Sequence, residues 1–126
     1  MSSRARALAV VVAVVVATAL AAPAAADDGR EVRVRTECSR GSEAELRLRA
    51  DDGELRVELR IDSPRGARWS VILLHERRIA FRGSVRATRS SGLRVRRTLR
   101  NLYGRDRVVV RATGSRTETC RISATF

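Results

Sequence analysis

Apolar and charged residues alternate with a period of two along most of the chain. The clearest stretch is 44–61, where Ala44, Leu46 and Leu48 begin a series of apolar residues with charged residues between them. In an extended strand this period places apolar side chains on one face and charged side chains on the other. Convincing helical spacing does not occur in 27–126. Eight segments alternate in this way or form short apolar runs: 32–38, 44–50, 55–61, 69–75, 79–87, 93–99, 107–113 and 120–126.

Turn-forming residues separate most of these segments. Strands with one dry and one wet face are typical of antiparallel sheets. Several short strands at this spacing, with turn signals between them, indicate a sandwich. The pattern therefore predicts an all-β, antiparallel β-sandwich of about seven to eight strands. The turn signals are SRGS at 39–42, DDG at 51–53, SPRGA at 63–67, SSG at 90–92, GRD at 104–106 and GSR at 114–116.

The stretch 44–61 also predicts its own register. Asp52-Gly53 is a favoured pair for a two-residue type I′ hairpin turn. With that turn, Arg47 faces Glu58 and Glu45 faces Arg60 on the wet face, whereas moving the turn back by one residue opposes like charges at two of three pairs. Opposite charges across strands are favourable. We therefore predict that Asp52-Gly53 is the tip and that this hairpin neutralises itself.

The N-terminal segment differs from the rest. Arg4 and Arg6 precede an uncharged apolar run at 7–22, and Pro23 and three alanines follow it. This order is that of a secretory signal peptide, which predicts a signal peptide at 1–26 and a β-sandwich domain at 27–126. A retained membrane anchor is the alternative, but the run has 16 residues and a spanning helix needs about 20. We expect a secreted, extracellular protein with no stable membrane insertion after cleavage.

The chain has two cysteines, Cys38 and Cys120. An exported chain meets oxidising conditions, so these predict one disulfide that closes almost the whole domain. Two free thiols are the alternative. Together with a single histidine, the two cysteines do not form a zinc pattern.

Composition adds a strong positive charge. All 26 basic residues are arginine, and the formal net charge is +12. The absence of lysine has two equally good explanations: a high-GC genome, whose codons favour arginine, and a functional need for arginine. The segment 77–111 holds twelve arginines and one acid, Asp106, so we expect one contiguous basic face there. The candidate anion-binding residues are Arg77, Arg78, Arg82, Arg86, Arg94, Arg96 and Arg97.

The residues and motifs of the sequence give little support to a catalytic function. His75 is the only histidine, and its position predicts an inward-facing structural side chain at a strand end. The G-x-S-x-G nucleophile motif is missing. We therefore predict a protein that is not an enzyme, with no catalytic, cofactor-binding or metal-binding residues. The charge favours polyanions, but the few aromatic residues disfavour a nucleic-acid partner, because single strands stack on exposed aromatic rings.

Several motifs resemble those of small exported proteins of high-GC actinobacteria. They are Cys38, DDGELRVELRID at 51–62, GARWSV at 66–71, Gly83, NLYGRD at 101–106 and Cys120. The resemblance implies export and an all-β fold, and it implies no activity. Trp69 is similar to the core tryptophan of immunoglobulin-like sandwiches, so we expect the β-sandwich to be immunoglobulin-like in its general architecture. The cysteines depart from that pattern, because they lie in the first and last predicted strands, so we expect a disulfide between terminal strands.

These observations predict an exported, non-enzymatic binding or structural module. Its basic surface would meet an anionic cell-wall or glycan polymer, or a protein partner. Two alternatives remain: a small secreted hydrolase or inhibitor that acts through loop residues, and a basic secreted protein with no dedicated polyanion ligand. Ile72 and Leu74 point outward in the predicted strand 69–75, so they form either a covered apolar strip or a partner contact.

Overall fold

The computed structural model describes residues 29–88, 92–102 and 104–126. The predicted signal peptide at 1–26 lies outside the described residues, and so do Arg89 and Tyr103. In the described part, all regular structure except one short 3₁₀ turn is β-strand, which confirms the all-β prediction. No helix there is long and apolar enough to cross a membrane.

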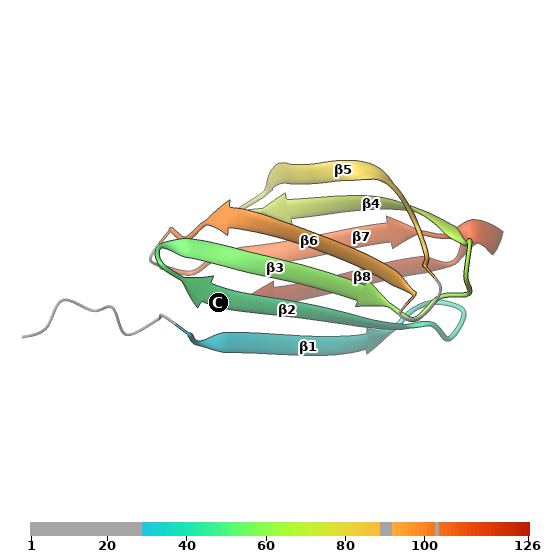
Figure 1. The fold of residues 1–126 in the computed structure, drawn as a ribbon, viewed down its shortest axis with the longest axis horizontal. Coiled ribbons are helices and arrows are strands. Elements are labelled where there is room, and N and C mark those ends of the chain that lie inside the picture. Colours follow the sequence, from blue (N-terminus) through green and yellow to red (C-terminus); the bar gives the residue numbers. More distant parts are fainter. Residues whose placement is uncertain (1–28, 89–91, 103) are drawn as a thin grey trace, which may run out of the picture.

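Eight strands form two four-stranded antiparallel sheets that face each other (Figure 1). Sheet A has the order β1-β2-β3-β6, and sheet B has the order β5-β4-β7-β8. The β-sandwich prediction is therefore confirmed. The strands are β1 (Glu31–Glu37), β2 (Glu43–Asp51), β3 (Glu54–Ile61), β4 (Arg68–His75), β5 (Arg78–Arg86), β6 (Leu93–Arg100), β7 (Arg107–Thr113) and β8 (Thr119–Thr125), with the 3₁₀ turn η1 (Ser115–Thr117) before β8.

The β2–β3 hairpin has the predicted register. Arg47 lies opposite Glu58, and Glu45 lies opposite Arg60. The tip is Asp52-Gly53, and both residues have positive φ angles of 48° and 77°, as a type I′ turn requires. Turn chemistry and cross-strand charge pairing agree here, so a local pattern was enough to predict the pairing of two strands.

The inward faces of the two sheets form one apolar core. Trp69 of β4 is 2% exposed, and its indole N–H donates to Ser63 Oγ at 2.9 Å. A Cβ on Gly114 would lie 2.7 Å from the Trp69 ring, so the chain after β7 can pass this close only with glycine. The outward faces of both sheets are left to charged, hydroxyl and a few half-buried apolar side chains.

The predicted disulfide joins Cys38 to Cys120. Cys38 directly follows β1, an edge strand of sheet A, and Cys120 lies in β8, an edge strand of sheet B. Both cysteines are buried, at 5% and 4% exposed. The bond therefore links the two sheets along one open side of the sandwich, as expected for terminal strands. It also indicates an oxidising compartment.

Candidate anion-binding face

The outer face of sheet A carries charges of both signs. Four of its seven outward carboxylates form ion pairs with neighbouring arginines: for example, Arg35 Nε lies 2.8 Å from Glu45, and Arg96 Nε lies 3.0 Å from Glu58. Arg56 likewise pairs with Asp51 at 3.0 Å. This face is therefore close to self-neutral. Its outward carboxylates are Glu31, Glu37, Glu43, Glu45, Asp51, Glu54 and Glu58, and its outward arginines are Arg33, Arg35, Arg47, Arg49, Arg56, Arg60, Arg94, Arg96 and Arg100.

The pairing on sheet A holds its carboxylates in the charged form. The hydrogen bond from Arg35 lowers the pKa of Glu45. Burial alone would raise the pKa of Glu58, but hydrogen bonds and ion pairs with Arg60 and Arg96 outweigh burial and lower it. Because these arginines are already engaged by protein carboxylates, they have little charge left for a ligand.

The outer face of sheet B is different, because its described strand positions carry arginine and no acid. Arg111 lies opposite Arg121 across β7 and β8, and Arg68 lies opposite Arg86 across β4 and β5. Like charges placed opposite each other destabilise a sheet by a few tenths to about 1 kcal/mol per pair. The six outward arginines of this face are Arg68, Arg82, Arg86, Arg107, Arg111 and Arg121, and we call them the sheet B arginines.

Registers across sheet B arrange its outward side chains in rows. The central row crosses all four strands as Arg82, Ile72, Arg111 and Arg121. Beside it runs a row of hydroxyls, Ser84, Ser70, Thr113 and Thr119. On its other side lies a mainly apolar row, Ile79, Leu74, Val109 and Ser123. Cations, hydroxyl groups and apolar side chains therefore form parallel bands on one surface.

No ion pair involves a sheet B arginine within the described ranges. The described acids that follow residue 62 in the sequence bond to groups other than the side chains of these arginines. Glu118 accepts hydrogen bonds from the Ser42 hydroxyl and from the backbone N–H groups of Arg40 and Ser42, and the Ser42 side chain is the main reason that its pKa is lowered. Asp106 is fully buried, and its Oδ1 lies 2.7 Å from His75 Nε2.

One end of the face is hollowed into a cleft of about 370 Å³. Leu74 and Val109 line it, and Arg107, Arg111 and Arg121 surround these apolar residues. The β4–β5 turn adds two further lining residues, Glu76 and Arg77.

The β4–β5 turn is unusual in its residues. Glu76 and Arg77 have φ angles of 48° and 65°, a left-handed conformation that side chains other than glycine and asparagine rarely adopt. Glu76 ties the turn to β7, because its carboxylate accepts the backbone N–H of Arg107 and its own N–H donates to the Arg107 carbonyl at 3.0 Å. Arg77 has no such tie among the described residues, so its conformation costs stability without a compensating local bond.

Replacing Arg77 by glycine is expected to change the free energy of unfolding by roughly 0 to +1 kcal/mol. Releasing the left-handed conformation stabilises by about 1–2 kcal/mol, and the greater freedom of glycine in the unfolded chain offsets about 0.5–1 kcal/mol of this. Arg78→Gly is the matched control, since Arg78 lies in β5 without a positive φ, and we expect it to lower stability by about 0.5–1 kcal/mol. Urea unfolding of both variants checks this. Equal destabilisation by the two substitutions would contradict the strain at Arg77.

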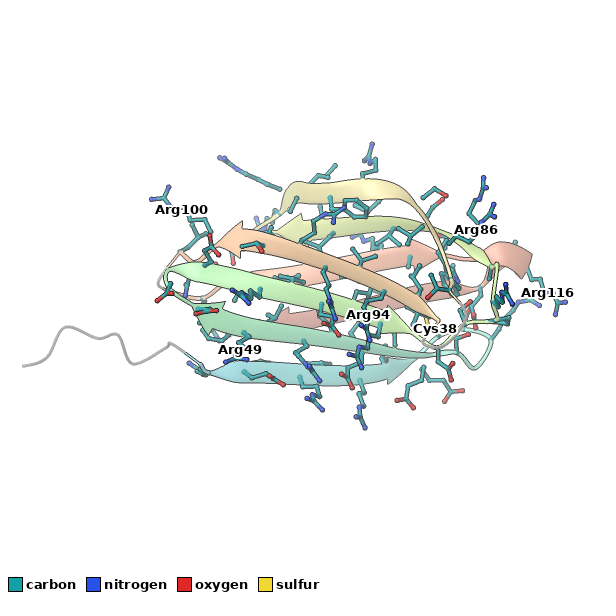
Figure 2. All side chains as sticks on the ribbon, in the orientation of Figure 1. Cys38, Arg49, Arg86, Arg94, Arg100 and Arg116 are labelled. Carbon is teal, nitrogen blue, oxygen red and sulfur yellow. A yellow bond between two sulfur atoms is a disulfide. The ribbon has the colours of Figure 1, made fainter. Side chains whose placement is uncertain are left out.

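The predicted arginine set does not share one face. Arg82 and Arg86 belong to sheet B, but Arg94 and Arg96 lie on sheet A, both beside Glu58. The reason is that the chain passes from one sheet to the other between β5 and β6, so Arg86 at the end of β5 and Arg94 and Arg100 on β6 belong to different layers (Figure 2). The expectation of one contiguous face from 77–111 is therefore wrong.

The remaining members of that set have other positions. Arg77 and Arg78 lie at the β4–β5 turn. Arg97 occupies an inward register position opposite Val57, and its guanidinium stacks on the Phe81 ring at 4.0 Å from the ring centroid. Arg97 therefore covers the open side of the sandwich between β6 and β5 and is not part of an outer face.

Arg68 and Arg121 belong to the sheet B arginines but lie outside 77–111, so the predicted set did not include them. A signal was present in the sequence. Every second residue from 68 to 74, from 107 to 113 and from 119 to 125 is arginine, hydroxyl-bearing or apolar, and none is acidic. Counting charge by strand face, instead of by segment, finds the sheet B arginines.

The described part of the chain holds no group of three or more His, Cys, Asp and Glu side chains placed to bind a metal. His75 is the last residue of β4 and occupies an inward register position opposite buried Val108, as predicted. It bonds to buried Asp106, and Asp106 also accepts the Leu102 N–H at 3.2 Å.

Unpaired guanidinium groups bind phosphate, sulfate and carboxylate through paired N–H donors. The neighbouring hydroxyl row adds weaker donors and acceptors over the same area. Electrostatic attraction and hydrogen bonding to an extended anion are therefore the chemistry that this face offers. No protein-family model, curated protein or solved structure matches the chain.

Proposed function

We propose that the protein is an exported, non-enzymatic binding module that holds an anionic cell-surface polymer against the outer face of sheet B. The observation that carries this proposal is the segregation of charge. Seven of the nine outward arginines of sheet A pair with carboxylates of that sheet. Sheet B presents six arginines that have no carboxylate partner in the described structure. Export is supported by the signal-type segment at 1–26 and by a disulfide that needs an oxidising compartment.

Genomic composition alone does not explain this segregation. A bias towards arginine codons adds arginine to both sheets, but it does not direct acids to one of them. Nine of the twelve acids in the described residues lie in 31–62, in the strands and turns of sheet A. The other three are Glu76, Asp106 and Glu118, each engaged by a hydrogen bond.

The shape of the face favours a polymer over a compact ligand. The sheet B arginines are spread over four strands, and neighbouring strands lie about 4.8 Å apart. An extended polyanion can contact several of them at once, and each contact releases counterions. Anionic wall polymers and acidic glycans are the polyanions that an exported protein meets.

The strand order supports an immunoglobulin-like arrangement as part of this proposal. Strands β2, β3 and β6 take the places of strands A, B and E, and β4, β7 and β8 take those of C, F and G. Buried Trp69 then lies on the strand that corresponds to C. In this arrangement β1 is an added edge strand, and the disulfide joins it to the last strand.

Retention on the cell envelope tests the proposed function. The purified protein is mixed with envelope fragments of the producing cells and washed at about 0.05 M and about 0.2 M salt. We expect strong retention in the first wash, and a partial loss in the second because each arginine contact releases counterions. A fraction should stay bound at about 0.2 M salt because paired guanidinium hydrogen bonds to the polymer add to the charge attraction. Complete release at about 0.2 M salt would reduce the binding to unspecific charge attraction and contradict a dedicated polymer site.

A further inference from the structure

The cleft at one end of the sheet B face differs from the rest of that face because it has an apolar floor. Leu74 and Val109 lie opposite each other in the register of β4 and β7, and both are half-buried. Ile79 continues the same row on β5 and is 52% exposed. A volume of about 370 Å³ is within the range of small-ligand sites.

The cleft walls carry more positive charge than one carboxylate ligand neutralises. Arg77, Arg107, Arg111 and Arg121 line the cleft, against the single carboxylate of Glu76. Glu76 is also engaged, because it accepts the Arg107 backbone N–H. A phosphate group has more acceptor oxygens than a carboxylate and receives paired N–H donors from several arginines at once. The charge therefore favours phosphate.

The apolar floor requires a second feature in the ligand. A bare phosphate or a sugar phosphate would leave Leu74 and Val109 in contact with water. An alkyl or acyl chain next to the phosphate would remove that apolar surface from water, which is favourable. The arginines and the floor adjoin in one cleft, so a single molecule can satisfy both.

The turn beside the cleft supplies one of the arginines that line it. Glu76-Arg77 is the two-residue loop of the β4–β5 hairpin, which requires positive φ angles, and arginine stands there in place of the usual glycine or asparagine. The strained residue is the one that brings the fourth guanidinium to the cleft. A strain-free glycine at this position would remove that cation.

We propose that this cleft binds a phosphate ester that carries an apolar chain next to the phosphate. The phosphate contacts the four arginines, and the chain lies on Leu74 and Val109. The inference rests on the proposed function, because it names the chemical group by which the face recognises its polymer or surface. A membrane phospholipid and a free or polymer-linked alkyl phosphate share this chemistry, because each joins a phosphate to an apolar chain.

Titration with three small probes tests the proposal. Methyl phosphate, hexyl phosphate and hexanoate are added to the isotope-labelled protein, and the amide signals of residues 74, 77, 109 and 111 are followed by NMR. We expect hexyl phosphate to bind at least tenfold more tightly than methyl phosphate, because part of its chain leaves water. We also expect it to bind at least tenfold more tightly than hexanoate. Equal binding of methyl and hexyl phosphate, or of hexyl phosphate and hexanoate, would overturn the proposal.

Two variants separate the contributions of charge and floor. Val109→Thr keeps the side-chain shape, so it should weaken hexyl phosphate binding several-fold and leave methyl phosphate binding unchanged. The double variant R111A/R121A should weaken both phosphates at least tenfold. Loss of methyl phosphate binding in Val109→Thr would count against the apolar role, and an unchanged hexyl phosphate affinity in R111A/R121A would count against the arginines.

The source of the phosphate ester is read from a second assay. The protein is sedimented with vesicles of zwitterionic lipid to which phosphatidic acid has been added. If the protein sediments with these vesicles and Val109→Thr sediments less, the result supports a membrane lipid as the source. Binding of hexyl phosphate without vesicle sedimentation supports a free or polymer-linked ester. If hexyl phosphate does not bind and envelope retention persists, the cleft inference fails and the proposed function stands. If retention at about 0.2 M salt is also lost, the proposed function itself fails.

Discussion

We expect the double variant C38A/C120A to unfold with a free energy about 4.5 kcal/mol below that of the native protein. The Cys38–Cys120 bond spans a sequence separation of 82 residues. A cross-link over a loop of that length lowers the entropy of the unfolded chain, and this loss corresponds to about 4.5 kcal/mol of stability at about 25 °C. Domains of this size have total stabilities of about 5–15 kcal/mol. The variant is therefore expected to be marginally folded or unfolded at 37 °C.

The position of the bond makes the prediction specific. It joins an edge strand of each sheet, so its loss should release β1 before the rest of sheet A. Guanidinium unfolding gives the change in stability, and amide hydrogen exchange gives the loss of protection in β1. The native protein under reducing conditions is the control and should behave in the same way. A stability change below about 1.5 kcal/mol would contradict the assigned role of the bond.

Removing three sheet B arginines should weaken polyanion binding about 100-fold at low salt. Arg82, Arg111 and Arg121 share the central row of the face and have no carboxylate partner in the described structure. Each arginine beside an anionic surface contributes about 1 kcal/mol, so the triple alanine variant loses about 3 kcal/mol of binding energy. The readout is the affinity for soluble inorganic polyphosphate.

The matched control removes the same charge from sheet A. Arg35, Arg56 and Arg96 are more than half exposed, and each pairs with a carboxylate. Exposed ion pairs contribute about 0–1 kcal/mol each, so R35A/R56A/R96A should remain folded. We expect its polyphosphate affinity to stay within about threefold of the native value, because these arginines are already neutralised. A similar loss in both triple variants would mean that net charge alone drives binding.

The parts of the fold that were predictable depend on local physics. The β2–β3 register follows from a two-residue turn and from charges that meet across adjacent strands, and both are visible within 44–61. The Cys38–Cys120 link was predictable because only one pairing exists. The number of strands follows from the two-residue period of apolar and polar residues. This period is visible in the sequence because each sheet has one face in the core and one face in water.

The candidate site was less predictable because it depends on which strands share a sheet. Arg86 and Arg94 are eight residues apart in sequence, but the crossing from β5 to β6 places them on opposite layers. Arg68 and Arg121 are far apart in sequence and share one outer face. The turn at Glu76-Arg77 was missed because it lacks the glycine or asparagine that normally marks positive φ angles.

The salt dependence of polyphosphate binding tests the central claim most directly. For a flexible polyanion, the slope of log K against log salt changes by about 0.7 for each phosphate contact. We expect a slope of about −4 for the native protein if all six sheet B arginines engage. The R82A/R111A/R121A variant should flatten it by about two, and R35A/R56A/R96A should leave it unchanged. Equal flattening by both variants would contradict a single cationic face on sheet B.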